Sequence, residues 1–214
     1  MNKTDSKSPK FRRRAEARPD EVLDAALALF TEQGYARTTV DQVARRAGFS
    51  KGTVYLYFSS KEAILEGLVR RAVEPIAEAS FDRMADYRGD PRPLLATFVQ
   101  TVAQTLSSGD YRTVPLIILR EAPAAPGIAA LFRNAVLDRA LPAMIGLLEQ
   151  GVAGGHIRAV DPELTARSVI GPVMVHLLLS EVFDIRPDGG MEMERLVENH
   201  LSILFAGLEP EGTT

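Results

Sequence analysis

Apolar residues recur at helical spacing near the start of the chain, between Pro19 and Gly34. They stand at positions i, i+3, i+4, i+7 and i+8, which form one stripe along an α-helix. Pro19 can begin this helix and Gly34 can end it. The pattern therefore predicts an amphipathic helix whose buried stripe consists of Val22, Ala25, Ala26, Leu29 and Phe30.

Two short helices are predicted directly afterwards. Thr39, with Gln42 three residues later, can form a capping box for a helix over Val40–Arg46. That helix ends at Gly48, and Ser50 can cap the next one. The second short helix opens with the sequence KGTVYLYF.

The rest of the chain reads as helices separated by breaks rich in Gly and Pro. Asp161-Pro162-Glu163 is a strong start, with an N-cap residue, a proline and an acid in the first turn. No run alternates with period two for long enough to make a strand. The further helices are expected over about 60–79 (capped by Ser59 or Ser60), 91–107, 111–121, 126–153, 161–184 and 190–208. The predicted fold class is all-α.

The composition narrows the class of protein. Apolar residues make up 46% of the chain, enough to bury a core, and there is no cysteine. The absence of cysteine excludes disulfides, thiolate zinc sites and thiol nucleophiles. No signal peptide is visible, and the most apolar run, 169–179, is too short to span a bilayer. A soluble, cytoplasmic protein is expected.

Charge is distributed unevenly along the chain. Residues 1–71 carry 14 Lys and Arg against 9 Asp and Glu, whereas residues 72–214 carry 11 Arg against 19 acids. A basic end on an acidic body suggests that this end meets a polyanion. The alternative is a loose basic tail on an ordinary acidic protein.

Two short helices joined by a glycine-containing turn are typical of a helix-turn-helix. The start of the second helix directs free N–H groups and a partial positive charge at a duplex. Lys51 can reach a guanine edge or a phosphate, and Gly52 allows close backbone approach. Tyr55 and Tyr57 can hydrogen-bond phosphates, whereas Val54 and Phe58 are expected to pack inward. The alternative for the tyrosines is an aromatic core cluster.

At these residues the sequence resembles the TetR family of transcription regulators. The resemblance runs from Val22 to Glu62, through VLDAALALFTEQGY and TTVDQVARRAGFSKGTVYLYFSSKE. It implies a helix-turn-helix DNA-binding domain over 19–64 and a helical ligand-binding and dimerisation domain over 65–214. Residues 1–18 are expected to form a disordered basic arm, because this segment is charged, contains a proline and has no periodicity. The residues that it assigns to DNA binding are Thr39, Ser50, Lys51, Gly52, Thr53, Tyr55, Tyr57 and Lys61.

Three details of the DNA-binding region remain open. Leu56 departs from the polar or aromatic residue of many family members, and could meet a thymine methyl or the protein itself. Lys61 stands in the first turn of its helix, where a cation is unfavourable, so an external phosphate is a plausible partner. The arm residues Arg12–Arg14 and Arg18 could enter a minor groove or remain a solvated tail.

In the family, the last two helices of each subunit pair into a dimer. Here, apolar residues cover nearly the whole circumference of 164–183, so this helix needs cover on both sides. A monomer with an unusually apolar core is the alternative. The expected interface residues are Val169, Val173, Leu177, Val197, Leu201 and Leu204.

The resemblance also implies an inducer pocket within 80–160, for an unknown small-molecule effector. Pro75, Pro115, Pro142 and Pro172 should kink or end helices, which can open a cavity. Core packing is the favoured alternative for every candidate. The candidate lining residues are Phe98, Val102, Leu116, Phe132, Met144 and Met174.

Other classes have little support. His156, His176 and His200 are far apart and lack metal spacing, and no GxSxG, Walker A or GxGxxG occurs. We therefore expect neither an enzyme nor a metal or cofactor. A helical interaction module is the remaining alternative. The expected function is that of a homodimeric repressor, which binds a pseudo-palindromic operator in double-stranded DNA and is released by an inducer.

Overall fold

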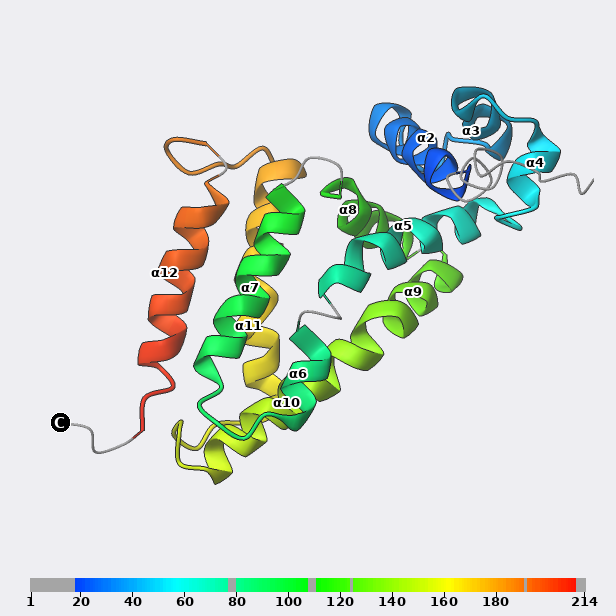
Figure 1. The fold of residues 1–214 in the computed structure, drawn as a ribbon. Coiled ribbons are helices and arrows are strands. Elements are labelled where there is room, and N and C mark those ends of the chain that lie inside the picture. Colours follow the sequence, from blue (N-terminus) through cyan, green and yellow to red (C-terminus); the bar gives the residue numbers. More distant parts are fainter. Residues whose placement is uncertain (1–17, 77–79, 108–110, 124, 191, 211–214) are drawn as a thin grey trace, which may run out of the picture. The chain divides into compact units, whose positions relative to one another are not determined.

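The computed structural model describes residues 18–76, 80–107, 111–123, 125–190 and 192–210 (Figure 1). The chain divides into two compact units, Met1–Leu68 and Val69–Thr214, and the division falls within one helix. The described residues form helices and turns without a strand, so the predicted all-α class is confirmed. None of these helices is long and apolar enough to cross a membrane.

The described residues of the N-terminal unit form three helices and the first half of a fourth. They are α2 (Arg18–Gln33), α3 (Val40–Ala47), α4 (Lys51–Tyr55) and α5 (Lys61–Ile76). The predicted apolar stripe on α2 is buried. Val43 of α3, Val54 of α4 and Ile64 of α5 are also fully inaccessible, so all four helices contribute to the core of this unit. The rings of Phe30 and Tyr35 meet edge to face, with their centroids 5.1 Å apart.

The C-terminal unit contains the remaining helices. They are α6 (Asp82–Asp86), α7 (Arg92–Ser107), α8 (Thr113–Glu121), α9 (Pro126–Phe132), the π-helical turn η2 (Arg133–Leu137), α10 (Asp138–Ala153), α11 (Pro162–Glu181) and α12 (Met193–Ala206). Helices α7, α11 and α12 run alongside one another, and α10 packs across α11 and against α6 (Figure 1). These contacts enclose the core of the unit.

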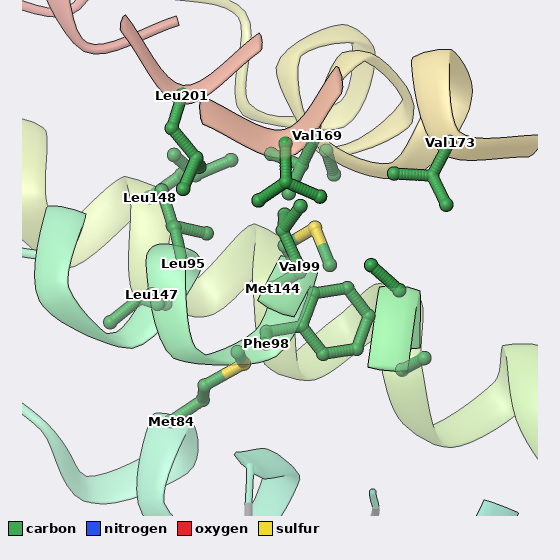
Figure 2. Packing of buried hydrophobic residues seen from close by; sticks show 14 of the residues in the cluster. Met84, Leu95, Phe98, Val99, Met144, Leu147, Leu148, Val169, Val173 and Leu201 are labelled. Atoms are coloured by element: carbon green, nitrogen blue, oxygen red, sulfur yellow. The ribbon is translucent and has the colours of Figure 1, made fainter. Parts of the chain in front are cut away.

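Side chains of the helices α6, α7, α10, α11 and α12 form the core of the C-terminal unit. Figure 2 shows Leu95 and Val99 of α7 with Met144 of α10 and Val169 of α11 in one cluster, which Leu201 of α12 completes. All five side chains are buried. The core therefore holds together elements that are far apart in the sequence.

Most predicted helices are present, with two differences. The predicted helix over 126–153 contains a π-helical turn between α9 and α10, and the five-residue helix α6 was not predicted. Pro142 and Pro172 lie inside α10 and α11 without ending them. The expected Asp161 cap is present, since its carboxylate accepts a hydrogen bond of 2.9 Å from the Leu164 N–H.

Candidate functional site

Helix α3 is fixed at both ends by the residues that predicted it. The Thr39 hydroxyl accepts from the Gln42 N–H at 3.3 Å, and the Gln42 side chain accepts from the Thr39 N–H at 2.8 Å, which completes the capping box. Gly48 has φ +74°, and the Phe49 N–H donates to the Ala44 carbonyl at 2.9 Å. This left-handed ending turns the chain sharply into the next helix.

Helix α4 follows after three residues, and the last of them, Ser50, caps it. The Ser50 hydroxyl accepts from the Thr53 N–H at 3.1 Å. Val54 is fully buried and anchors the helix to the core of the N-terminal unit. Helices α3 and α4 with the intervening turn therefore form a helix-turn-helix, as predicted.

One face of α4 remains exposed. Lys51, Gly52 and Tyr55 lie on it, and directly after the helix Tyr57 is exposed and Leu56 is 81% exposed. This exposure argues against an aromatic core cluster for the two tyrosines. It also shows that Leu56 does not pack against the described part of the chain. Sequence reasoning left Leu56 undecided because its chemistry fits either environment.

Gly52 lies on this face with open space around it. A Cβ added there would meet only the Ser50 hydroxyl, at 3.8 Å, which is an ordinary van der Waals distance. The fold therefore does not require glycine at this position. Because Gly52 has no side chain, another molecule could approach the backbone closely at this position.

Both lysines of the predicted DNA-binding set have partners within the chain. The Lys51 ammonium lies 3.3 Å from the Asp41 carboxylate, and both side chains are more than half exposed. The Lys61 ammonium donates to the Tyr35 carbonyl at 2.9 Å and stands 4.2 Å from the centroid of the Tyr35 ring. The sequence suggested an external phosphate as the partner of the Lys61 ammonium. In the structure, the Tyr35 carbonyl is its hydrogen-bond acceptor instead.

Acidic groups of the N-terminal unit are held ionised by hydrogen bonds. The pKa of Glu62 is lowered by its own backbone N–H, then by the Ser60 hydroxyl and the Tyr35 hydroxyl. The pKa of Glu32 is lowered by the Arg46 guanidinium, which donates two hydrogen bonds to it at 2.6 and 2.7 Å. The Glu32–Arg46 pair connects α2 to α3.

The C-terminal unit encloses a cavity of about 390 Å³. Five predicted residues line it: Phe98, Val102, Phe132, Met144 and Met174. The sixth, Leu116, is half-buried against the core and does not contribute to the lining. Sequence reasoning missed Val136 and Leu137 of the π-helical turn, because no sequence signal marked that turn.

The predicted interface residues on α11 and α12 face inward instead. Val169, Val173 and Leu177 are fully buried in the core of the protomer, Val197 and Leu201 are also buried, and Leu204 is half-buried against the core. The five buried side chains are therefore not available to a partner, and their prediction was wrong, whereas that of Leu204 stays a prediction. When apolar residues surround an α-helix on all sides, the sequence pattern does not identify the face that packs against the core.

Other apolar residues of these helices are exposed. On α11, Leu164 is 61% exposed and Val175 is 53% exposed, and on α12, Ile203 is 64% exposed. His176 lines an open hollow between α11 and α12, and its Nε2 atom is buried without a hydrogen-bond partner. This outer face offers apolar surface for a partner.

The remaining predicted groups are dispersed. Arg12–Arg14 lie outside the described residues, and Arg18 begins α2 with its guanidinium 6.0 Å from the centroid of the Phe49 ring. His200 is buried, with its Nε2 atom 2.8 Å from the Val169 carbonyl oxygen. In the part of the chain that the structure describes, no group of three or more His, Cys, Asp or Glu could hold a metal ion.

Two family descriptions match the chain. Residues 22–68 match "bacterial regulatory proteins, tetR family", and residues 85–188 match "tetracyclin repressor-like, C-terminal domain". The first match covers the helix-turn-helix, and the second covers most of the unit with the cavity.

Individual relatives agree with these matches. The HTH-type transcriptional repressor KstR2 of Rhodococcus jostii is 26% identical over 89% of this chain and 91% of its own length. The fatty acid metabolism regulator protein of Bacillus subtilis is 26% identical over 72% and 78%. SmeT, the repressor of a multidrug efflux pump of Stenotrophomonas maltophilia, is 28% identical with a TM-score of 0.74, covering 94% of each chain. A SmeT–triclosan complex matches with 25% identity and a TM-score of 0.73, over 92% of this chain and 94% of that one.

Proposed function

Because the chain belongs to the tetR family and is a DNA-binding transcription regulator rather than an enzyme, we propose that it is a homodimeric repressor released by a small-molecule inducer. Repression is the role named for KstR2 and SmeT. A regulator of this kind acts on chromosomal DNA and therefore in the cytoplasm. The observation that carries the proposal is the exposed face of α4, which is anchored from behind by Val54.

In this proposal, α4 is the recognition helix and enters the major groove. Lys51 and Thr53 lie in its first turns, where they would meet base edges or phosphates. Tyr55 and Tyr57 would donate hydrogen bonds to phosphates and fix the register. Leu56 would contact the methyl group of a thymine, the apolar feature of the major-groove edge of DNA.

The other predicted contacts lie at helix starts. Thr39 begins α3 and Ser50 begins α4, where N–H groups and the helix dipole favour a phosphate. Gly52 would let the backbone approach the groove. Lys61 would reach a phosphate only by giving up its bond to the Tyr35 carbonyl, so we assign it a smaller share of the affinity.

We propose that the exposed outer face of α11 and α12 makes the dimer. Val175 and Ile203 would then be buried against the same face of a second copy, in a two-fold arrangement. Such a dimer would present two recognition helices to half-sites about 34–36 Å apart. A pseudo-palindromic operator follows from this symmetry.

The cavity of the C-terminal unit is the proposed inducer site. It is enclosed by side chains of several helices, including Phe98 of α7 and Met174 of α11. A ligand can release the operator only if it binds the DNA-free state more tightly than the DNA-bound state. SmeT forms a complex with triclosan, which supports a small-molecule effector for a protein with this fold.

A salt titration of DNA binding tests the proposal. Fluorescence anisotropy would follow labelled DNA from upstream of the protein's own gene, with random DNA as competitor. We expect competitor-resistant binding whose log affinity falls steeply with log salt concentration. Lys51→Ala and Tyr55→Phe should weaken it while the dimer stays intact. Binding that never exceeds the random-DNA level across genomic fragments would favour an interaction module instead.

A reporter gene behind the protein's own promoter separates repression from activation. Expression of the protein should lower reporter activity. Activity that rises instead would make the protein an activator, and unchanged activity would contradict regulation at this promoter.

A further inference from the structure

We propose that the cavity of the C-terminal unit selects neutral, apolar effectors and discriminates against anionic or cationic amphiphiles of the same size. This inference rests on the proposed function, since it assigns a ligand class to the proposed inducer site. It is carried by the chemistry of the cavity wall rather than by its location.

The wall is almost entirely apolar. Of the 20 lining residues that the structure describes, Thr105, Tyr111 and Arg167 alone carry polar side chains, and none of the 20 is Asp, Glu, Lys or His. Aromatic and aliphatic groups such as Phe81, Phe98 and Ile170 supply the rest. A ligand that fills this volume gains free energy from removing its own apolar surface from water.

Arg167 is the one charged residue among the described residues of this wall, and its charge already has a partner. Its Nη2 atom lies 2.7 Å from the Glu163 carboxylate, and its Nη1 atom donates to the Glu163 carbonyl at 2.8 Å. The Arg167 side chain is 54% exposed. Its guanidinium is therefore neutralised at the solvent side, while its aliphatic stem can contribute to the wall.

The two neutral polar groups fit a weakly polar ligand. The Thr105 hydroxyl donates its proton to the Thr101 carbonyl at 2.9 Å, so this proton is already used within α7. Tyr111 can either donate or accept one hydrogen bond through its phenol. Arg71 stands 5.7 Å from the centroid of the Tyr111 ring and is not part of the cavity wall.

A charged headgroup would therefore be poorly accommodated. A carboxylate would have to compete with Glu163 for Arg167 or lose its hydration among apolar side chains, and an ammonium would meet no acidic group in the part of the wall that the structure describes. Burial of an uncompensated charge is strongly unfavourable. An alcohol or a ketone loses less on entering and can use Tyr111.

The test compares three ligands with the same alkyl chain: dodecanol, dodecanoate and dodecylammonium. The two ions are kept below their critical micelle concentrations and dodecanol below its solubility limit. The full-length protein is first loaded with N-phenyl-1-naphthylamine, a neutral apolar probe whose fluorescence rises on burial. We expect dodecanol to displace the probe at pH 7.5 at a concentration at least about tenfold lower than either charged analogue. Displacement by dodecanoate should strengthen as the pH falls and its carboxylate is protonated.

Matched variants locate the binding. Val102→Phe and Val136→Phe place added volume on the cavity wall, whereas Leu119→Phe adds the same kind of bulk at an exposed position of α8 outside it. Either cavity variant should reduce probe binding at least about fivefold if the side chain fills the space, and Leu119→Phe should leave it unchanged. Two cavity variants keep the test decisive if one of them does not fold.

The outcomes separate the ligand class from the proposed function. Displacement by dodecanoate or dodecylammonium as efficient as by dodecanol would overturn the neutral class and leave the cavity as effector site. Failure of the probe to bind, or binding that both cavity variants leave unchanged, would overturn the cavity as effector site itself. Operator binding by the ligand-free protein is independent of both results.

Discussion

The ammonium group of Lys51, at the start of α4, lies 3.3 Å from the carboxylate of Asp41 on α3. This ion pair connects the two helices of the helix-turn-helix on their exposed side. It also places a negative charge beside the residue that we expect to contact DNA. Exposed pairs of this kind contribute little to stability, so its main effect should be on binding.

Asp41→Asn is therefore expected to strengthen operator binding. The substitution removes repulsion between the carboxylate and phosphate, and it releases Lys51. We expect an increase in affinity of about 3- to 10-fold at low salt that shrinks as salt is added. Anisotropy titrations would measure it, with Glu149→Gln, an exposed position on α10, as the matched control. Equal or weaker binding by Asp41→Asn would argue against contact between this surface and DNA.

Gly52→Ala separates folding from recognition. Open space around Gly52 and its helical position predict equal or slightly higher stability, by up to about 1 kcal/mol. Affinity for the operator should nevertheless fall, because the new methyl group would stand between the backbone and the groove. Thermal unfolding and anisotropy on the same sample would show the two effects with opposite sign. A stable variant with undiminished affinity would contradict the close approach at Gly52.

The pKa of Glu62 predicts a pH dependence of stability in the N-terminal unit. Since the folded-state pKa lies below the ordinary value of 4.5, the ionised carboxylate stabilises the folded state above that pH. The contribution is lost as the pH falls through the lowered pKa. Glu62→Gln should therefore lower Tm at pH 7 by about 1–2 °C, a small effect because water screens this exposed group. Circular dichroism melts should show the difference narrowing below pH 4.5, and a difference independent of pH would speak against this origin.

Two valines of α11 test the proposed dimer face. Val175→Arg, at an exposed position, should leave the protomer folded and weaken the dimer by at least about 100-fold. Val173→Arg, at a fully buried position, should instead unfold the protomer. Sedimentation and circular dichroism distinguish these results, with Leu119→Arg as a control on another exposed surface. A fully dimeric Val175→Arg variant would place the interface elsewhere.

Features that depend on residues close together in the sequence were predicted correctly, whereas features that depend on long-range packing were not. The Thr39–Gln42 capping box, the turn at Gly48 and the Asp161 cap are set by residues a few positions apart, and each was predicted correctly. Val54 was also correctly predicted to point inward, because its place in the short helix fixed its direction.

Long-range packing explains the failures. Val173 and Val175 are chemically identical in the sequence, and only the positions of α7, α10 and α12 decide which of them is buried. Leu116 and Phe132 are both apolar and suit a cavity wall, but only Phe132 lines the cavity. Their sequence positions alone could not distinguish them. The helix α6 was missed because a five-residue helix carries too little periodicity to be recognised.

Helix α5 belongs to both units, because the division between them falls after Leu68 in the middle of its 16 residues. Each amide of a helix interior bonds to a carbonyl one turn earlier, so melting either half would strip hydrogen bonds from the other. The two units should therefore unfold in one cooperative transition in calorimetry. An effector held by the C-terminal unit would then protect the amides of the helix-turn-helix from hydrogen exchange by global unfolding, without touching them.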